Sequence, residues 1–112
     1  MSQESGYPEF IKSWPLADLA FEGVKGYLLA APQGQAVFFE LPAGVQVPPH
    51  SHGAQWGIVV SGSIELTIGG ETKIYRRGDS YVIGDGEEHA ARVLEPSLII
   101  DVFADPDRYQ AK

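Results

Sequence analysis

The stretch GVQVPPHSHGAQWGIVVSG, residues 44–62, decides how this chain is expected to fold. It contains His50 and His52, two of only three histidines in the protein, directly after two prolines. Proline disfavours a helix and favours an extended chain, both for itself and for the residue before it. On an extended strand, side chains two residues apart point to the same face. We therefore expect both imidazoles on one face, where together they can bind one metal ion.

Two further residues could complete such a site. Gln55 follows shortly after Gly53, which makes a turn or bulge easy, and its amide oxygen is a possible fourth, neutral ligand. The third histidine, His89, ends the turn-rich stretch GDGEEH and enters another expected strand. A His-x-His pair alone often has no function, and a lone interior histidine is usually just hydrogen-bonded. The residues by themselves therefore leave open both a metal site and ordinary core histidines.

The composition argues against several classes of protein. The 112 residues, 44% of them hydrophobic, fit one small domain with a core. A formal net charge of −7 argues against binding to nucleic acids or to anionic membranes. Without cysteine there is no disulfide, thiol nucleophile or thiolate metal site. The start MSQESGYPEF does not resemble a signal peptide, and no apolar run approaches the ~20 residues of a membrane span. We expect a soluble cytoplasmic protein.

The pattern of short apolar segments predicts an all-β fold. Glycine and proline recur every several residues, and the segments between them are rich in valine, isoleucine, tyrosine and phenylalanine. The expected strands are 24–31, 35–41, 45–47 (ending at the prolines), 55–61, 63–68, 71–76, 80–83, 90–94 and 98–103. Gly69 and Gly70 suit a tight hairpin. The first 15–20 residues are expected to be irregular or to add a strand, and the tail DPDRYQAK to form one helical turn.

Alternation within the expected strands indicates which residues form the core. Ile64, Leu66 and Ile68 alternate with polar residues and should point inward. Leu98, Ile100 and Val102 alternate with Asp101 and are interpreted as ordinary core.

The chain resembles the cupins in two consecutive motifs. The first cupin motif, Gly-x5-His-x-His, a few residues, Glu-x6-Gly, corresponds here to Gly44, His50, His52, Gln55 and Gly62. The second, Gly-x5-Pro-x-Gly-x2-His-x3-Asn, corresponds to Gly78, Gly84, Gly86, His89 and Val93. The chain departs from the pattern where Gln55 replaces glutamate, with two residues between it and His52 in place of three or four, and where Gly84 replaces proline and Val93 replaces asparagine.

The resemblance implies an antiparallel jelly-roll barrel, or double-stranded β-helix, of about eight to ten strands. Residues 1–112 would form one cupin domain, with a motif core at 44–93, an irregular N-terminal segment at 1–20 and a tail at 104–112.

The resemblance also implies a divalent metal ion, with His50, His52, Gln55 and His89 as its ligands. Because Gln55 is neutral, the bound ion would keep a formal net charge of +2, where the usual glutamate leaves +1. Such an ion attracts anionic ligands more strongly but is held less tightly. Imidazole ligands suit Zn, Fe, Ni, Cu or Mn, and the sequence does not choose among them.

Two classes of function fit these expectations. One is a metal-dependent enzyme, an oxygenase, isomerase or lyase, acting on a small polar or anionic molecule. The alternative is a non-catalytic module that binds or senses a small ligand. No catalytic residue can be named, because the sequence offers no clear general base. Tyr81 and Phe39 could line the pocket or fill the core, and Glu87 or Glu88 could orient a histidine or be solvated turn charges.

An apolar outer face predicts a homodimer. If Gln55 faces the inside of the barrel, then Trp56, Ile58 and Val60 face outward and need a cover. A second copy of the chain is the favoured cover. The alternative is the N-terminal segment with Phe10, Ile11 and Trp14.

Overall fold

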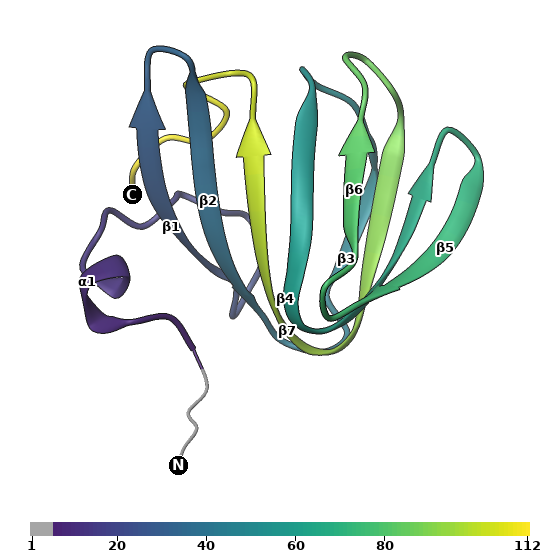
Figure 1. The fold of residues 1–112 in the computed structure, drawn as a ribbon, viewed down its shortest axis with the longest axis horizontal. Coiled ribbons are helices and arrows are strands. Elements are labelled where there is room, and N and C mark those ends of the chain that lie inside the picture. Colours follow the sequence, from purple (N-terminus) through teal and green to yellow (C-terminus); the bar gives the residue numbers. More distant parts are fainter. Residues whose placement is uncertain (1–5) are drawn as a thin grey trace.

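The computed structural model describes residues 6–112, which form one antiparallel seven-stranded sheet that curls into an open barrel (Figure 1). This confirms the predicted all-β class. In chain order the elements are α1 (Glu9–Lys12), β1 (Lys25–Ala31), β2 (Gly34–Leu41), β3 (Gln46–His50), β4 (Gln55–Ile68), β5 (Glu71–Arg76), β6 (Ser80–Ile83) and β7 (His89–Phe103). The strands are ordered β1-β2-β7-β4-β5; β3 also pairs with β7, and β6 with β4.

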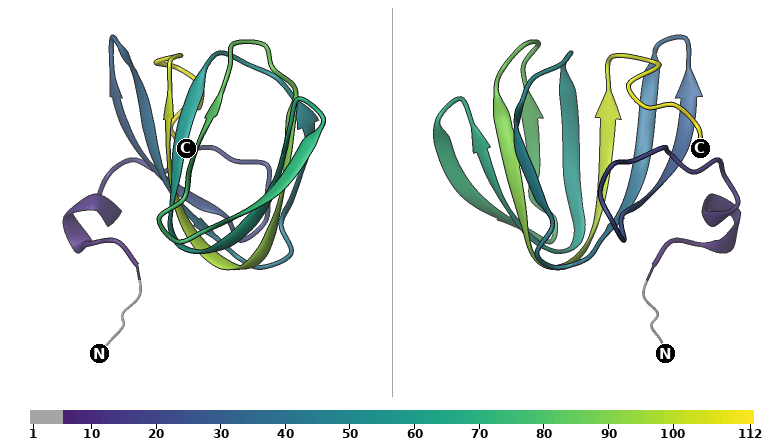
Figure 2. Two further views of the ribbon diagram at one scale, coloured as in Figure 1. Left: turned by 45° about the vertical axis from the view of Figure 1, so that its right-hand side comes forward. Right: turned by 180° about the vertical axis from the view of Figure 1, so that it is seen from behind.

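Two long strands, β4 and β7, build both walls of the barrel (Figure 2). The first residues of β4 pair with β6, and its last residues pair with β5. The register between β4 and β7 shifts three times between Val59 and Ile64, and Gly62 adopts a φ of 89° at this bend. The expected strands 55–61 and 63–68 are therefore one continuous strand. The same holds for 90–94 and 98–103, which is why the sheet has seven strands.

The strand β3 continues through the two prolines, where the sequence had predicted it to end. Among residues 6–112 it pairs only with β7, and it has an irregular register between Val47 and His50. An edge strand tolerates proline, because the missing N–H is not needed by a second neighbour. The continuation places His50 opposite His89 on β7.

The inward face of β7 corrects one prediction about the core. Ile99, Asp101 and Phe103 are 2%, 7% and 2% exposed, whereas Val102 is 42% exposed. The predicted core residues Leu98, Ile100 and Val102 thus point outward. Both faces of this strand carry large apolar residues, so alternation could not identify the inner one. In β4 the prediction is correct, since Ile64 and Leu66 are buried in the core.

The two terminal segments are joined to each other beside the barrel. Leu16 forms a β-bridge with Tyr27, and Ala17 forms one with Ala111. Figure 2 shows the C-terminus next to the N-terminal segment. The tail forms turns and this bridge, so the predicted helical turn is wrong. Among residues 6–112, no helix is long and apolar enough to span a membrane.

Candidate metal centre

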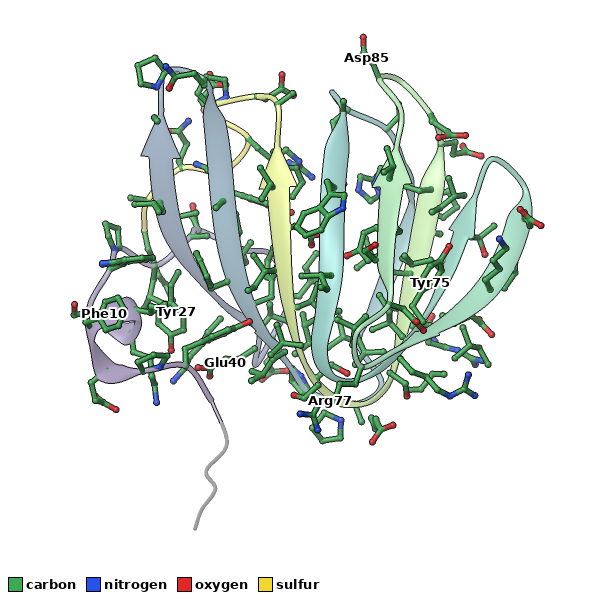
Figure 3. All side chains as sticks on the ribbon, in the orientation of Figure 1. Phe10, Tyr27, Glu40, Tyr75, Arg77 and Asp85 are labelled. Atoms are coloured by element: carbon green, nitrogen blue, oxygen red, sulfur yellow. The ribbon has the colours of Figure 1, made fainter. Side chains whose placement is uncertain are left out.

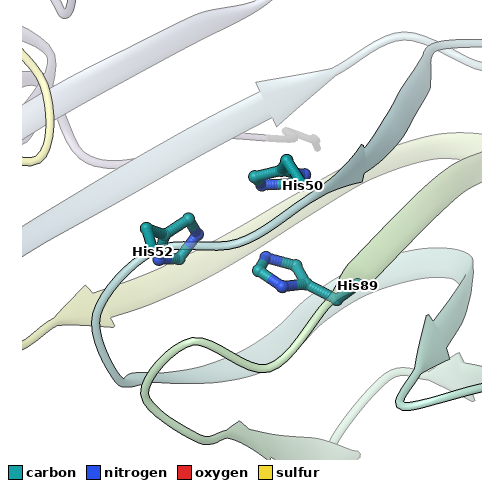
Figure 4. A group of neighbouring side chains, drawn as sticks. All are labelled: His50, His52 and His89. Carbon is teal, nitrogen blue, oxygen red and sulfur yellow. The ribbon is translucent and has the colours of Figure 1, made fainter.

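The fold brings the three histidines together. His50 ends β3, His89 begins β7, and the two are register partners, while His52 lies in the loop after β3. One nitrogen of each ring lies within 4.8 Å of the others (Figure 4). The ring centroids of His50 and His89 are 4.2 Å apart, and those of His52 and His89 are 4.7 Å apart. Strand pairing thus places His89 beside a pair that is distant in the sequence.

Backbone carbonyls select the tautomer of all three rings. Nδ1 of His50 contacts the carbonyl oxygen of Pro48 at 2.9 Å, and Nδ1 of His52 contacts that of Gly53 at 2.8 Å. Nδ1 of His89 contacts the carbonyl of Glu87 at 3.0 Å. A carbonyl only accepts hydrogen bonds, so each Nδ1 carries a proton, and in the neutral ring Nε2 keeps its lone pair. This arrangement is the usual support for metal-binding imidazoles.

Burial favours the neutral form of two of the rings. Desolvation lowers the pKa of His52 and of His89 below the ordinary 6.5, more than the backbone hydrogen bonds raise it. Neighbouring positive charge, including Arg108, acts in the same direction as burial. A neutral imidazole is the form that can bind a metal ion.

Gln55, the first residue of β4, lines the same cavity as the histidines. It is 9% exposed, and its Oε1 is buried without a hydrogen-bond partner among residues 6–112. An unpaired buried oxygen is costly, so a partner is expected for it. An ion held by the histidines would supply that partner. Three imidazoles and one amide oxygen fit a divalent transition metal better than Ca²⁺ or Mg²⁺.

The cavity has a volume of about 430 Å³ and an apolar wall. Tyr81 and Phe39 both line it and are also part of the buried core, so each of the two interpretations holds in part. The N-terminal segment contributes Leu19 and Phe21, and the tail contributes Arg108. The cavity is therefore built from the sheet and from both terminal segments.

Asp101 is a buried acid in this cavity that sequence reasoning had missed. Its Oδ1 accepts a hydrogen bond from the Tyr81 hydroxyl at 2.6 Å. Burial raises the pKa of Asp101 to about 6, while hydrogen bonds from Tyr81 and Gln55 act in the opposite direction. The available signal was a single acidic residue within the apolar run LIIDVF. Because this strand reads as ordinary core, the acidic residue does not stand out in the sequence.

Arg108 is a second residue that the sequence did not indicate. It lines the cavity, and its Nε is buried without a hydrogen-bond partner in the described part of the chain. Its guanidinium carbon lies 4.3 Å from the ring centroid of Tyr109 and 5.6 Å from that of Phe103. A guanidinium held against aromatic rings is suited to bind a carboxylate. No local pattern in the tail could have placed it here.

The acidic pair beside His89 does not orient this histidine through a carboxylate. The backbone carbonyl of Glu87 holds its Nδ1. The Glu87 side chain instead accepts a hydrogen bond from the Gly84 N–H at 3.0 Å and closes the turn. Glu87 and Glu88 are both exposed.

Comparison with known families agrees with the fold and the motifs. The profile of the cupin domain matches residues 37–103, which include all three histidines and Gln55. The chain belongs to the cupin family. This confirms the resemblance drawn from the two motifs, although three motif positions differ.

The chain is similar to three particular proteins, one by sequence and two by structure. The pectin degradation protein KdgF of Dickeya dadantii (strain 3937) is 39% identical over 59 residues, which are 50% of this chain and 54% of that protein. The match thus spans about half the length of this relative. The structure of KdgF from Halomonas sp. matches with a TM-score of 0.74 and 32% identity, over 82% of this chain and 86% of that one. An RmlC-like cupin from Shewanella frigidimarina NCIMB 400 matches with a TM-score of 0.77 and 25% identity, over 96% and 94%.

Proposed function

We propose that this chain is a single cupin domain that catalyses proton transfer on a small carboxylated sugar. It would bind a divalent transition-metal ion, with His50, His52, Gln55 and His89 as ligands. The reaction would be an isomerase or lyase reaction. The observation that carries the proposal is the buried carboxyl group of Asp101, which lines the same cavity as the histidine cluster. It supplies the proton acceptor that a purely binding cupin does not need.

Two positive groups support an anionic substrate. The four proposed ligands are neutral, so the bound ion would keep its full charge. Arg108 adds a second cation whose buried Nε lacks a partner among the described residues. A carboxylate is the group that pairs best with a planar guanidinium. A small acid could therefore contact both cations within one cavity of about 430 Å³.

The sugar component rests on the relatives. Two of them are KdgF proteins, and one of these is named a pectin degradation protein. Pectin is built largely from galacturonic acid, a sugar that carries a carboxylate. The cations of this cavity are compatible with such an acid. The expected substrate is therefore a small uronic acid released when pectin is broken down.

The roles of the protein's own residues follow from their positions. Asp101 would accept a proton from the substrate and return it at another atom. Tyr81 holds that carboxylate by a hydrogen bond of 2.6 Å, and Arg108 would orient the substrate by its carboxylate. When bound, the metal ion would act as a Lewis acid on a substrate oxygen. The apolar wall keeps water away from the reacting group.

The proposal is tested with the small acids obtained from pectin digestion. Metal-loaded protein is incubated with them in D₂O, and deuterium incorporation and new products are followed by NMR. Conversion is expected for the wild type and should be lost in Asp101→Asn, while Asp85→Asn, a change in an exposed turn (Figure 3), keeps it. Saturable binding without conversion would instead support the alternative, a non-catalytic binding module.

We further propose that the outer face of the sheet pairs with a second copy of the chain. Trp56 lies between Val82 and Val102 in register across β6, β4 and β7. These side chains are 41%, 70% and 42% exposed. The N-terminal segment does not cover them, because Trp14 packs on Phe38 instead, with ring centroids 5.5 Å apart. A contiguous exposed apolar row of this kind is typical of an interface.

A further inference from the structure

We infer that Gln35 is a positioning residue for Arg108, and so for the recognition of an anionic substrate. This inference rests on the proposed function. It concerns a residue far from the metal ligands in the sequence, on β2, which neither cupin motif contains.

Gln35 uses both ends of its side-chain amide on one residue of the tail. Its Nε2 donates to the carbonyl oxygen of Tyr109 at 2.9 Å, and its Oε1 accepts from the Tyr109 N–H at 3.0 Å. Gln35 is only 3% exposed. A buried amide with both partners satisfied is a strong and directional contact. The side-chain amide thus pairs with the backbone of Tyr109 in the way that a neighbouring β-strand would, and so holds the tail.

The tail is held on its other side by the N-terminal segment. The Asp18 N–H donates to the carbonyl oxygen of Gln110 at 2.8 Å, and the Lys112 N–H donates to that of Leu16 at 2.7 Å. Together with the Gln35 bonds to Tyr109, these bonds hold three residues of the tail. Arg108, directly before the clamped Tyr109, is therefore placed by the backbone.

Gln35 also fixes the rings on which Arg108 lies. The backbone of Gln35 is paired with Phe103 on β7, and the ring of Phe103 is 5.7 Å from that of Tyr109. The Arg108 guanidinium lies against both rings. Gln35 thus holds both β7, which carries the Phe103 ring, and the tail, which carries the Tyr109 ring. Loss of the two hydrogen bonds between Gln35 and Tyr109 would let Arg108 leave the cavity while the metal ligands stay in place.

The first test follows Arg108 directly and needs no ligand. In ¹⁵N-arginine-labelled protein, with the Arg108 signal assigned through Arg108→Lys, hydrogen exchange of the Nε–H group is measured by NMR. Burial should slow this exchange relative to exposed arginines. Gln35→Met, which keeps the side-chain length but has no amide, should remove the protection, while Gln33→Met in the adjacent exposed turn should keep it. Unchanged protection in Gln35→Met would overturn the inference.

The second test is a double-mutant cycle on anion binding. The zinc-loaded protein is titrated with D-galacturonate and with D-galactose, which lacks the carboxylate. Gln35→Met should weaken galacturonate binding about tenfold, the scale of one well-made hydrogen bond, and leave galactose binding unchanged. In the Arg108→Met background it should add nothing. Gln35 would have only a structural role if the losses of galacturonate affinity in Gln35→Met and Arg108→Met were additive. The same would follow if Gln35→Met weakened the binding of both sugars equally.

The two arms separate this inference from the proposed function. If the wild type does not prefer galacturonate over galactose, the proposed substrate class is wrong, and the exchange measurement still decides the role of Gln35. If Gln35→Met does not fold, Gln35→Glu takes its place. This variant keeps an acceptor for the Tyr109 N–H, but replaces the donor by a charged oxygen that faces the Tyr109 carbonyl oxygen. It should show partial loss of Arg108 protection, and full protection would contradict the inference.

Discussion

The Tyr81 hydroxyl and the Asp101 carboxylate meet over Gly57, 2.6 Å apart. Gly57 is the register partner of Tyr81 on one side and of Asp101 on the other. A Cβ atom at this position would overlap both side chains. The missing side chain of one residue therefore permits the hydrogen bond that holds the proposed proton acceptor.

Gly57→Ala is accordingly expected to damage both stability and activity. The added methyl group must displace Tyr81 or Asp101, and overpacking of this kind typically costs about 1–3 kcal/mol of unfolding free energy. Urea unfolding measures the loss, and the D₂O assay measures the activity. Gly84→Ala is the control, because its Cβ would meet only Glu87 Oε1, at 3.6 Å. Equal stability of the two variants would contradict the packing argument.

Substitutions of the four proposed ligands should have unequal effects on metal binding. His50→Ala, His52→Ala and His89→Ala should each nearly abolish metal content in protein purified without a histidine tag. Gln55→Ala should lower affinity by only about 1 kcal/mol, because it removes one weak neutral donor. Gln46→Ala, on the exposed part of β3, is the matched control.

Gln55→Glu should tighten metal binding, because it places a charge opposite the cation. The same change puts a second carboxylate beside Asp101, so the metal-free variant should be less stable than the wild type. Calorimetric titration with zinc and urea unfolding without metal test the two effects. Unchanged affinity in both Gln55 variants would mean that the three histidines alone form the site.

Metal affinity should depend on pH through the histidines. Protons compete with the metal ion for Nε2, and burial lowers the pKa of His52 and His89 below 6.5. Affinity should therefore change little above 6.5 and fall steeply at lower pH. Competition titrations with a chelator across this range measure it, and circular dichroism checks that the fold persists. Affinity that stays constant well below pH 6.5 would exclude histidine ligands.

Asp101 should make the metal-free protein lose stability as the pH rises. Its pKa is raised from 3.8 to about 6, so the folded state binds more protons than the unfolded chain between these values. Across this window, the unfolding free energy of the wild type should fall by about 3 kcal/mol relative to Asp101→Asn. Urea unfolding at a series of pH values tests this. Asp85→Asn should follow the wild type, and parallel curves for wild type and Asp101→Asn would contradict the prediction.

Trp56→Glu should convert a dimer into monomers on sizing chromatography. A charge in the centre of the exposed row Val82–Trp56–Val102 cannot be buried against a second copy without a large penalty. Ile74→Glu, at an equally exposed residue of β5, should leave the dimer intact. An unmodified protein that already elutes as a 12.1 kDa monomer would refute the proposed interface.

The sequence by itself determined the strand-rich class, the cupin motifs and the residues that could bind a metal. These signals are local: prolines before His50, the spacing of His50 and His52, and glycines at the turns. Local spacing also placed Trp56 and Val60 on the outer face, since alternation along one strand needs no knowledge of its neighbours.

Only the tertiary structure decided which groups complete the site. The inner face of β7 could not be chosen from a strand with large apolar residues on both faces, so Asp101 was hidden. The need for glycine at position 57 comes from Tyr81 and Asp101, which lie on the two strands that flank it in space. Arg108 reaches the cavity because Gln35 and the N-terminal segment hold the tail, through contacts between residues 74 or more positions apart. Such long-range pairing depends on the whole packed barrel, and no short window of sequence encodes it.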